Sequence, residues 1–158
     1  MQLQLVSDVN LLFDDPDTDP YGDDFNDEIQ EVLTDSIGEV NYDLGHLFDF
    51  GVPDGNAGSV GNVCRDGFKG SAYTSHPFVD TTEIGAFLND YFDIDFVAHE
   101  IGHQFGGYHT FSFETGVAGV NSEPGSGSTI MAYAGVTAED NVQNHSDPYF
   151  HYNSIKNI

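Results

Sequence analysis

The spacing of apolar residues near the start of the chain predicts strand structure followed by a helix. Residues 2–6 alternate polar and apolar side chains, and residues 9–13 are apolar except for Asn10, which predicts one strand or two short ones. From 25 to 37, apolar side chains return at the spacing of one helix face: Phe25, Ile29, Val32, Leu33 and Ile37. Gly38 follows where a C-terminal cap belongs, so we expect an amphipathic helix that covers a sheet.

The middle of the chain predicts extended structure and then a glycine-rich segment. Residues 40–50 favour an extended segment, in which we interpret His46 as a structural residue. Residues 51–64 are rich in glycine and other small residues, which weaken the packing of a strand but let another backbone approach closely. An edge strand that pairs with a peptide has this property, and an ordinary flexible loop is the alternative. Residues 82–92 predict either a short helix or an irregular loop.

The last part of the chain predicts two helices separated by irregular structure. Phe96, Val97 and Ile101 provide apolar cover for a helix whose N-cap we expect at Asp93 or Asp95. Irregular structure is expected after this helix as far as residue 127. A terminal helix is expected to open at 146–148, where proline would occupy its first turn.

Composition restricts the classes of partner. The 158 residues with 39% apolar content suit one domain with a core. A net charge of −24, from 27 acidic and 3 basic residues, disfavours nucleic acid and anionic membranes as partners. Such acidity suits a saline or calcium-containing medium, or simply solubility. The first residues lack the pattern of a signal peptide, no stretch has the length of a membrane span, and composition leaves the oligomeric state undetermined.

An acidic segment over 14–24 raises the question of calcium. The spacing of Asp15, Asp17 and Asp19 is that of alternate ligands in a calcium loop. Pro20 occupies the position where an EF-hand has glycine, and Asn26 the position of its closing glutamate. We therefore favour a solvated acidic turn and keep Ca²⁺ as a second candidate cofactor.

Residues 99–109, HEIGHQFGGYH, predict a zinc site with its own base. His99 and His103 are four residues apart, so on a helix they differ by about 40° and lie on one face, where both can bind one metal ion. Glu100 follows the first ligand, which places its carboxylate beside the metal, where it can take a proton from a zinc-bound water. The alternative is a chance cluster of histidines that pack or face water.

The third histidine requires the helix to end. On a continued helix His109 would lie about 15 Å further along the axis and point away by roughly 80°. Gly106 is placed to end the helix, because glycine accepts the left-handed conformation found at helix C-termini. The spacing therefore predicts a bent site in which His109 is the third ligand.

The chain resembles the metzincin zinc endopeptidases, and most closely their reprolysin-like (adamalysin-related) members among secreted bacterial proteins. The zinc motif at 99–109 carries the likeness, and Met131 fits the methionine turn that runs beneath the metal. Further similar segments are 17–21, 41–46, 97–100, 109–111, 123–131 and 146–151.

This resemblance implies an α+β catalytic domain over 1–158. It would have a twisted mixed sheet with helices above a zinc cleft, forming an upper subdomain over 1–106, and a small lower subdomain over 107–158. An edge strand formed by Ala57, Gly58, Ser59, Val60 and Gly61 would bind the substrate backbone antiparallel. Tyr133 matches a tyrosine that in some metzincins ligates zinc or steadies the oxyanion, and packing is its alternative role.

The resemblance also has departures, which leave two functional hypotheses. Family domains usually begin with a further strand and a long helix, so this chain is expected to be N-terminally truncated, and Cys64 has no cysteine to pair with. We expect a secreted zinc endopeptidase that cleaves polypeptides by zinc-activated water, with Glu100 as general base. The alternative is a zinc-loaded peptide-binding domain with little turnover.

Overall fold

The computed structural model describes residues 4–5, 9–15, 17–76, 90–113 and 119–158 and shows an α+β protein. Its helical elements are the short 3₁₀ helices η1 (Val9–Leu11) and η2 (Glu39–Asn41), the π-helix η3 (Phe92–Val97), and the α-helices α1 (Phe25–Ser36), α2 (Ala98–Gln104) and α3 (Tyr152–Asn157). Its strands are β1 (His46–Asp49), β2 (Asp54–Asn56), β3 (Ala72–Ser75), β4 (His109–Phe111) and β5 (Gly119–Glu123). Among the described residues, no helix combines the length and the apolar character that a membrane span requires.

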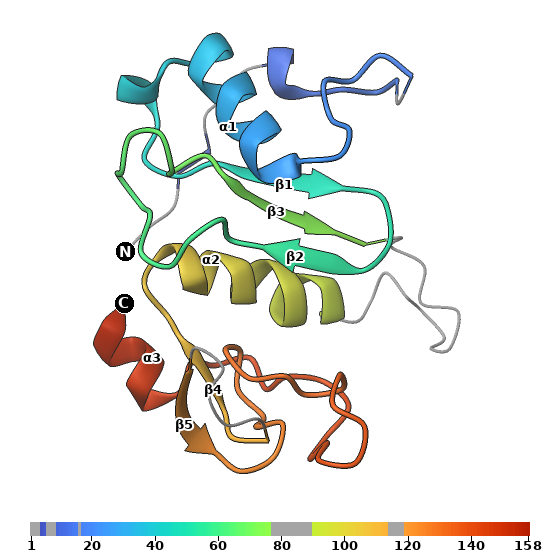
Figure 1. Cartoon of the computed structure of the whole chain (residues 1–158), viewed down its shortest axis with the longest axis vertical. Helices are drawn as coiled ribbons and strands as arrows, with labels where there is room; N and C mark the ends of the chain where they lie inside the picture. Colours follow the sequence, from blue (N-terminus) through green and yellow to red (C-terminus); the bar gives the residue numbers. More distant parts are fainter. Residues whose placement is uncertain (1–3, 6–8, 16, 77–89, 114–118) are drawn as a thin grey trace.

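A small mixed sheet separates the two longer helices. Its strand order is β1-β3-β2, with β1 parallel and β2 antiparallel to β3. In Figure 1, α1 covers one face of this sheet and α2 lies along the other, while β4, β5 and α3 lie beyond α2. β2 is therefore an edge strand beside the helix that carries the histidine motif.

Helix α1 forms as its apolar spacing predicts. Asp24 caps its start by accepting a hydrogen bond from the backbone N–H of Asp27, and Gly38 follows its end with a φ of 80°. Its buried face, Ile29 and Leu33, packs with Tyr42 in the apolar core above the sheet.

His46 is a structural residue, as its position predicts. Its Nδ1 lies 3.1 Å from Oε1 of Gln104 and its Nε2 lies 2.7 Å from Oγ1 of Thr74. The Gln104 side chain also donates to the carbonyl oxygen of Gly45. Burial lowers the pKa of His46, so its neutral ring joins β1 and β3 to the end of α2.

The predicted N-terminal strands are wrong where the structure describes them. Residues 9–11 form the 3₁₀ helix η1, residues 4–5 and 12–15 belong to no strand, and the rest of 2–6 lies outside the described residues. Leu5 and Leu12 are 92% and 77% exposed, so these apolar side chains have no buried sheet face to occupy. The short helix or loop expected over 82–92 also falls mostly outside the described residues.

The edge strand lies a few residues earlier than predicted. Residues 54–56 form β2, whereas 57–61 turn away from the sheet. Gly58 and Gly61 have φ values of 70° and 71°, and the Asn56 side chain accepts from the N–H of Gly58, which closes the turn. The N–H of Gly61 then donates to the carbonyl oxygen of His103, so this segment satisfies the end of α2 instead of extending the strand.

Two helix starts also differ from the predictions. Helical backbone is already present at Phe92, so Asp93 and Asp95 lie inside the π-helical turn and neither is an N-cap. Helix α3 begins at Tyr152, several residues after 146–148, and its cap is His151, whose Nδ1 accepts from the N–H of Asn153.

Candidate metal centre and active site

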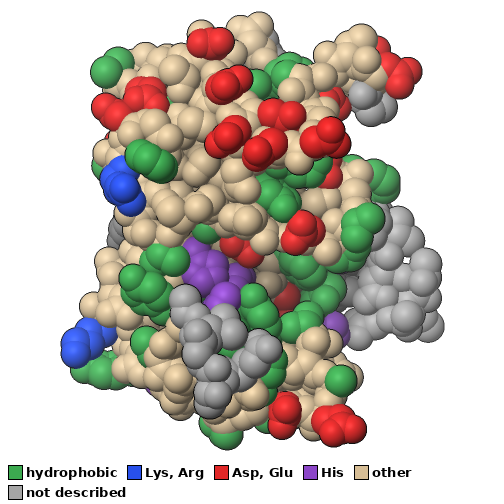
Figure 2. Space-filling view, in the orientation of Figure 1, with side chains coloured by type: hydrophobic (Ala, Val, Ile, Leu, Met, Phe, Trp, Pro, Cys, Tyr) green, Lys and Arg blue, Asp and Glu red, His purple; other side chains and the backbone are tan. Residues whose placement is uncertain are grey.

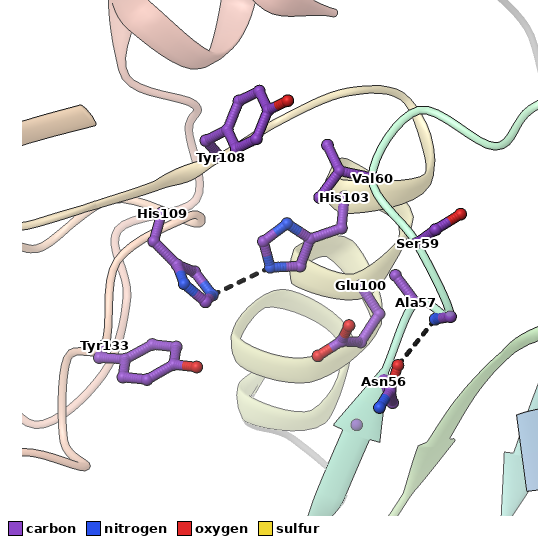
Figure 3. Close-up of a pocket in the computed structure, with 11 residues that line it drawn as sticks. Asn56, Ala57, Ser59, Val60, Glu100, His103, Tyr108, His109 and Tyr133 are labelled. Carbon is purple, nitrogen blue, oxygen red and sulfur yellow. Dashed lines mark hydrogen bonds between the residues drawn. The ribbon is translucent and has the colours of Figure 1, made fainter. Parts of the chain in front are cut away.

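Three imidazole rings converge, each presenting one nitrogen. The Nε2 atom of His103 lies 3.1 Å from that of His99 and 3.0 Å from that of His109, and the remaining pair is 3.2 Å apart. Within the described ranges, these rings form the group of His, Cys, Asp and Glu side chains whose donor atoms cluster as metal ligands do. Figure 2 shows histidine side chains in a hollow at the centre of the face, and Figure 3 shows His103 and His109 turned toward each other.

The other ring nitrogens set the tautomers. Nδ1 of His99 lies 2.6 Å from the carbonyl oxygen of Ile130, and Nδ1 of His103 lies 2.7 Å from that of Gly107. A carbonyl oxygen only accepts, so each Nδ1 carries the ring proton and donates it. Both Nε2 atoms are then unprotonated, with their lone pairs directed at the same point, as in histidines oriented for a metal.

The protonation state of the rings suits metal binding. Burial, together with the neighbouring imidazoles, lowers the pKa of His99 well below its usual range. Burial likewise lowers the pKa of His103, and lowers that of His109 to about 4. The rings are therefore neutral near pH 7, which is the form that binds a metal ion.

The spacing of the nitrogens fits zinc. At a Zn–N distance of about 2.0–2.1 Å, the nitrogens of a tetrahedral site are roughly 3.3–3.4 Å apart. The distances of 3.0–3.2 Å between the three Nε2 atoms agree to within a few tenths of an ångström. His99, His103 and His109 can therefore hold Zn²⁺ with little rearrangement.

Glycine ends the motif helix, as its sequence predicts. Gly106 has a φ of 108°, and a Cβ there would lie 2.9 Å from the carbonyl oxygen of Asn157. The N–H of Gly107 donates to the carbonyl oxygen of Gly102, and β4 then begins directly at His109. The turn thus brings the third ring back to the two rings on α2.

Met131 is fully buried beneath the helix that carries two of the rings. A Cβ built on Gly102 would lie 2.4 Å from the Met131 Sδ atom, so this sulfur packs directly against the helix backbone. A Cβ on Gly107 would lie 3.3 Å from the same sulfur. Met131 thus supports both α2 and the turn that returns the chain to His109.

Glu123 holds the segment that precedes this methionine. Its carboxylate accepts hydrogen bonds from the N–H of Ser128, the N–H of Thr129 and the hydroxyl of Thr129, at 2.9, 3.2 and 2.5 Å. Burial alone would raise the pKa of Glu123, but the hydroxyl of Thr110, together with these hydrogen bonds from Thr129 and Ser128, outweighs burial and lowers it. Since Ile130 follows directly and its carbonyl oxygen accepts a hydrogen bond from the His99 ring, Glu123 positions this ring indirectly.

Glu100 lies between the histidines and the edge strand. A Cβ on Gly55 would lie 2.7 Å from Oε1 of Glu100, so only glycine at this position of β2 leaves room for the carboxylate. Burial and the charge of Asp54 raise the pKa of Glu100 to about 8, while a hydrogen bond from the backbone of Ala57 lowers it. A metal ion among the histidines would favour the ionised form.

A cavity of about 300 Å³ opens on this group. Its lining combines residues of β2 and of the turn after it, residues of the histidine motif, and Tyr133: Gly55, Asn56, Ala57, Gly58, Ser59, Val60, Glu100, His103, Tyr108, His109 and Tyr133. Figure 3 shows the Tyr133 hydroxyl pointing toward Glu100. The Tyr133 ring lies 4.6 Å from that of His109, centroid to centroid. The predicted residues 57–60 thus lie at the cavity, although as a turn and not as a strand.

A second cavity, of about 250 Å³, adjoins the other side of Glu100 and His99. Asp95 is part of its lining, and one oxygen of this carboxylate accepts from the N–H of Ser146 at 2.7 Å. Burial raises the pKa of Asp95, while Ser146 and His145 lower it. The sequence analysis did not predict that Asp95 lines a cavity beside Glu100, although Asp95 precedes His99 by four residues and so lies on the same helix face.

The α+β scaffold and the converging neutral imidazoles define a metal-binding protein of the three-histidine type. A family model described as metallo-peptidase family M12B, reprolysin-like, matches residues 1–158. The chain therefore belongs to the reprolysin-like M12B metallopeptidases, and its histidine trio fits the zinc of that family. No curated protein and no solved structure matches the chain.

The acidic side chains of residues 14–24 do not converge as the three histidines do. Asp15 accepts from the N–H of Asp17, and Asp19 from the N–H of Tyr21, so these side chains close local turns. Asp15, Asp17 and Asp19 form no convergent ligand group among the described residues. A calcium site here stays a prediction.

Proposed function

We propose that the chain is a zinc-dependent endopeptidase in which Glu100 acts as general base. The observation that carries this proposal is the position of the Glu100 carboxylate, which lines both cavities beside the histidine trio. When bound, zinc supplies Lewis-acid activation of water and of the scissile carbonyl group. The remaining steps follow from side chains of this protein.

Glu100 is suited to accept and return a proton. Burial and the charge of Asp54 raise its pKa to about 8, which makes the carboxylate a stronger base than a free glutamate, and the N–H of Ala57 orients it. We infer that Glu100 takes a proton from the attacking water and passes it to the departing amine. Asp54 assists by raising the basicity of Glu100.

The substrate backbone is proposed to pair with β2. This strand is the edge of the described sheet, and the cavity beside Glu100 follows it from Gly55 onward. An extended peptide can add to such an edge through main-chain hydrogen bonds. An antiparallel orientation would carry the peptide across Glu100, with residues 57–60 bordering its path.

Tyr133 is proposed to donate its hydroxyl to the carbonyl oxygen on which negative charge develops. The direction of this hydroxyl supports the proposal, and the ring contact with His109 supports a packing role. Tyr133→Phe separates the two roles because it keeps the ring. A drop in kcat with unchanged zinc content would support hydrogen-bond donation by the hydroxyl. An unchanged kcat would indicate that Tyr133 acts through packing only.

We further propose that residues 1–158 act as one catalytic domain, with an upper part over 1–106 and a lower part over 107–158. The cleft would lie between them, because the chain leaves α2 at Gly106 and returns through His109. Both parts contribute to the first cavity, which supports this division.

Glu100→Gln provides the test of this function. The variant keeps the size of the side chain and an oxygen to accept from Ala57, but it cannot take up a proton. We expect a zinc-loaded variant to cleave a quenched peptide pool about 10²–10⁴-fold more slowly than the parent. Glu139→Gln, at an exposed position, is the matched control and should cleave at the parent rate.

Three outcomes separate the hypotheses. Chelator-sensitive cleavage by the parent, lost in Glu100→Gln, supports the endopeptidase with this base. Equal rates in the parent and Glu100→Gln would refute the mechanism. Peptide binding by folded, zinc-loaded parent without cleavage would indicate the alternative, a peptide-binding domain.

A further inference from the structure

The cavity that contains Asp95 is separate from the one that contains His103 and His109, yet both adjoin Glu100. Its wall is formed by the start of β2 on one side and by the chain after Met131 on the other, with Val136 at a 60% exposed position. A peptide bond held beside Glu100 therefore has a second hollow next to it, able to receive a side chain. Its volume of about 250 Å³ suits a large side chain.

The charges around this cavity have one sign. Asp54, Asp95 and Glu100 line it, and none of the described lining residues is a lysine or an arginine. Asp90 adds a further negative field at Asp95, and His145 is the nearby group that opposes it. In Figure 2, acidic side chains lie beside and above the histidines, whereas Lys and Arg are seen at the left margin of this face.

Only one of the two carboxylate oxygens of Asp95 accepts a hydrogen bond among the described residues. Oδ1 accepts from Ser146, while Oδ2 is buried and has no hydrogen-bond partner among the described residues. A buried carboxylate oxygen without a donor is unfavourable, and a nearby cationic donor relieves this. Occupation of the cavity by an ammonium or guanidinium group would supply the missing counter-charge.

Aromatic side chains complete the fit for such a group. Tyr91 and Phe96 also line the cavity, and their rings pack edge to face at 5.2 Å between centroids. The aliphatic stem of lysine or arginine packs well on aromatic surfaces, and its charged end is attracted to ring faces. Walls of this kind, with carboxylates around them, match a long basic side chain better than a neutral or acidic one.

The direction of β2 shows which substrate residue enters this cavity. Pro53 and Asp54, at the start of the strand, border the Asp95 cavity, and residues 56–60, at and beyond its end, border the other. A peptide antiparallel to β2 runs in the opposite sense, so its amino-terminal part lies at 56–60. The residue after the cleaved bond then lies at Asp95.

We infer that the Asp95 cavity selects lysine or arginine at the residue on the carboxyl side of the cleaved bond. This inference rests on the proposed endopeptidase function and names the substrate class of the same site. Asp95 acts here as a specificity-determining residue.

The test uses three matched peptides that differ only at this position, carrying arginine, norleucine or glutamate. With zinc-loaded parent protein we expect kcat/KM for the arginine peptide to exceed that for the glutamate peptide at least about tenfold. Asp95→Asn keeps the acceptor for Ser146 and removes the charge, so it should reduce this ratio roughly tenfold. Asp93→Asn is the matched control, because it removes the same charge from an exposed position two residues away and should preserve the ratio.

A second variant covers the case in which Asp95→Asn does not fold. Val136→Lys adds a cation at the exposed rim of the cavity and should shift the preference toward glutamate. Equal cleavage of the arginine and glutamate peptides by the parent, or an unchanged ratio in folded Asp95→Asn, would overturn the inference. If the parent cuts neither the three peptides nor a general peptide pool, the result would instead refute the endopeptidase function.

Discussion

Replacing Gly102 by alanine should destabilise the protein, although alanine favours helices. Gly102 lies within α2, between the two rings that this helix contributes. A Cβ there would lie 2.4 Å from Sδ of Met131 and 2.9 Å from Cε1 of Phe150. Both distances are shorter than real Cβ contacts, so the buried methionine and the ring would have to move.

The magnitude follows from two opposing effects. Alanine in place of glycine stabilises a helix interior by up to about 1 kcal/mol. Overpacking of a buried site costs about 1–3 kcal/mol, and two short contacts place Gly102 in the upper part of that range. We expect a net loss of about 1–2 kcal/mol in the free energy of unfolding, or about 2–8 °C in Tm for a chain of this size.

Urea unfolding of the chelator-treated parent and variant measures this loss without a contribution from zinc binding. Met131→Ala and the double variant complete a cycle. Met131→Ala alone should cost roughly 2–5 kcal/mol, and the double variant should lose less than the sum, because the new methyl group occupies vacated space. A Gly102→Ala protein as stable as the parent, with additive effects in the cycle, would refute the packing of Met131 beneath the helix.

Two further predictions concern the carboxylates of the site. Gly55→Ala places a Cβ 2.7 Å from Oε1 of Glu100 and should lower kcat about 10²-fold with zinc content unchanged, whereas a kcat within twofold of the parent would contradict the need for close approach. The pKa of Glu123 is lower in the folded protein than in the unfolded chain. Its contribution to the free energy of unfolding is therefore complete above the unfolded pKa of about 4.3, and it is lost as the pH falls through the folded pKa. In chelator-treated samples, the Tm difference between the parent and Glu123→Gln should therefore shrink below about pH 4.3. The Tm of Glu139→Gln should equal that of the parent at each pH. A Tm difference between the parent and Glu123→Gln that widens toward acid pH would contradict the role of Glu123.

The convergence of the three histidines was predictable because it depends on local geometry. The relation of His99 to His103 follows from one helical turn, and the need for a break before His109 follows from the length of the helix. Gly106 meets that need with a φ of 108°. Such conclusions require no knowledge of distant parts of the chain.

Features that depend on tertiary contacts could not be predicted in this way. The glycines of residues 51–64 indicated an approaching backbone, but at Gly55 the Glu100 side chain fills the space. Asp95 looked like a helix cap because a π-helical turn has no marked spacing of its own in sequence. The role of Glu123 arises from a turn that begins five residues later, at Ser128.

The measurement that tests the central claim most directly is the rate of peptide cleavage as zinc is added back to metal-free protein. Three neutral histidines that converge at 3.0–3.2 Å define one site per chain, so the rate should rise linearly to one zinc per chain and then level off. A cleavage rate that does not depend on added zinc, or that needs more than one equivalent, would contradict a single three-histidine zinc centre as the source of the activity.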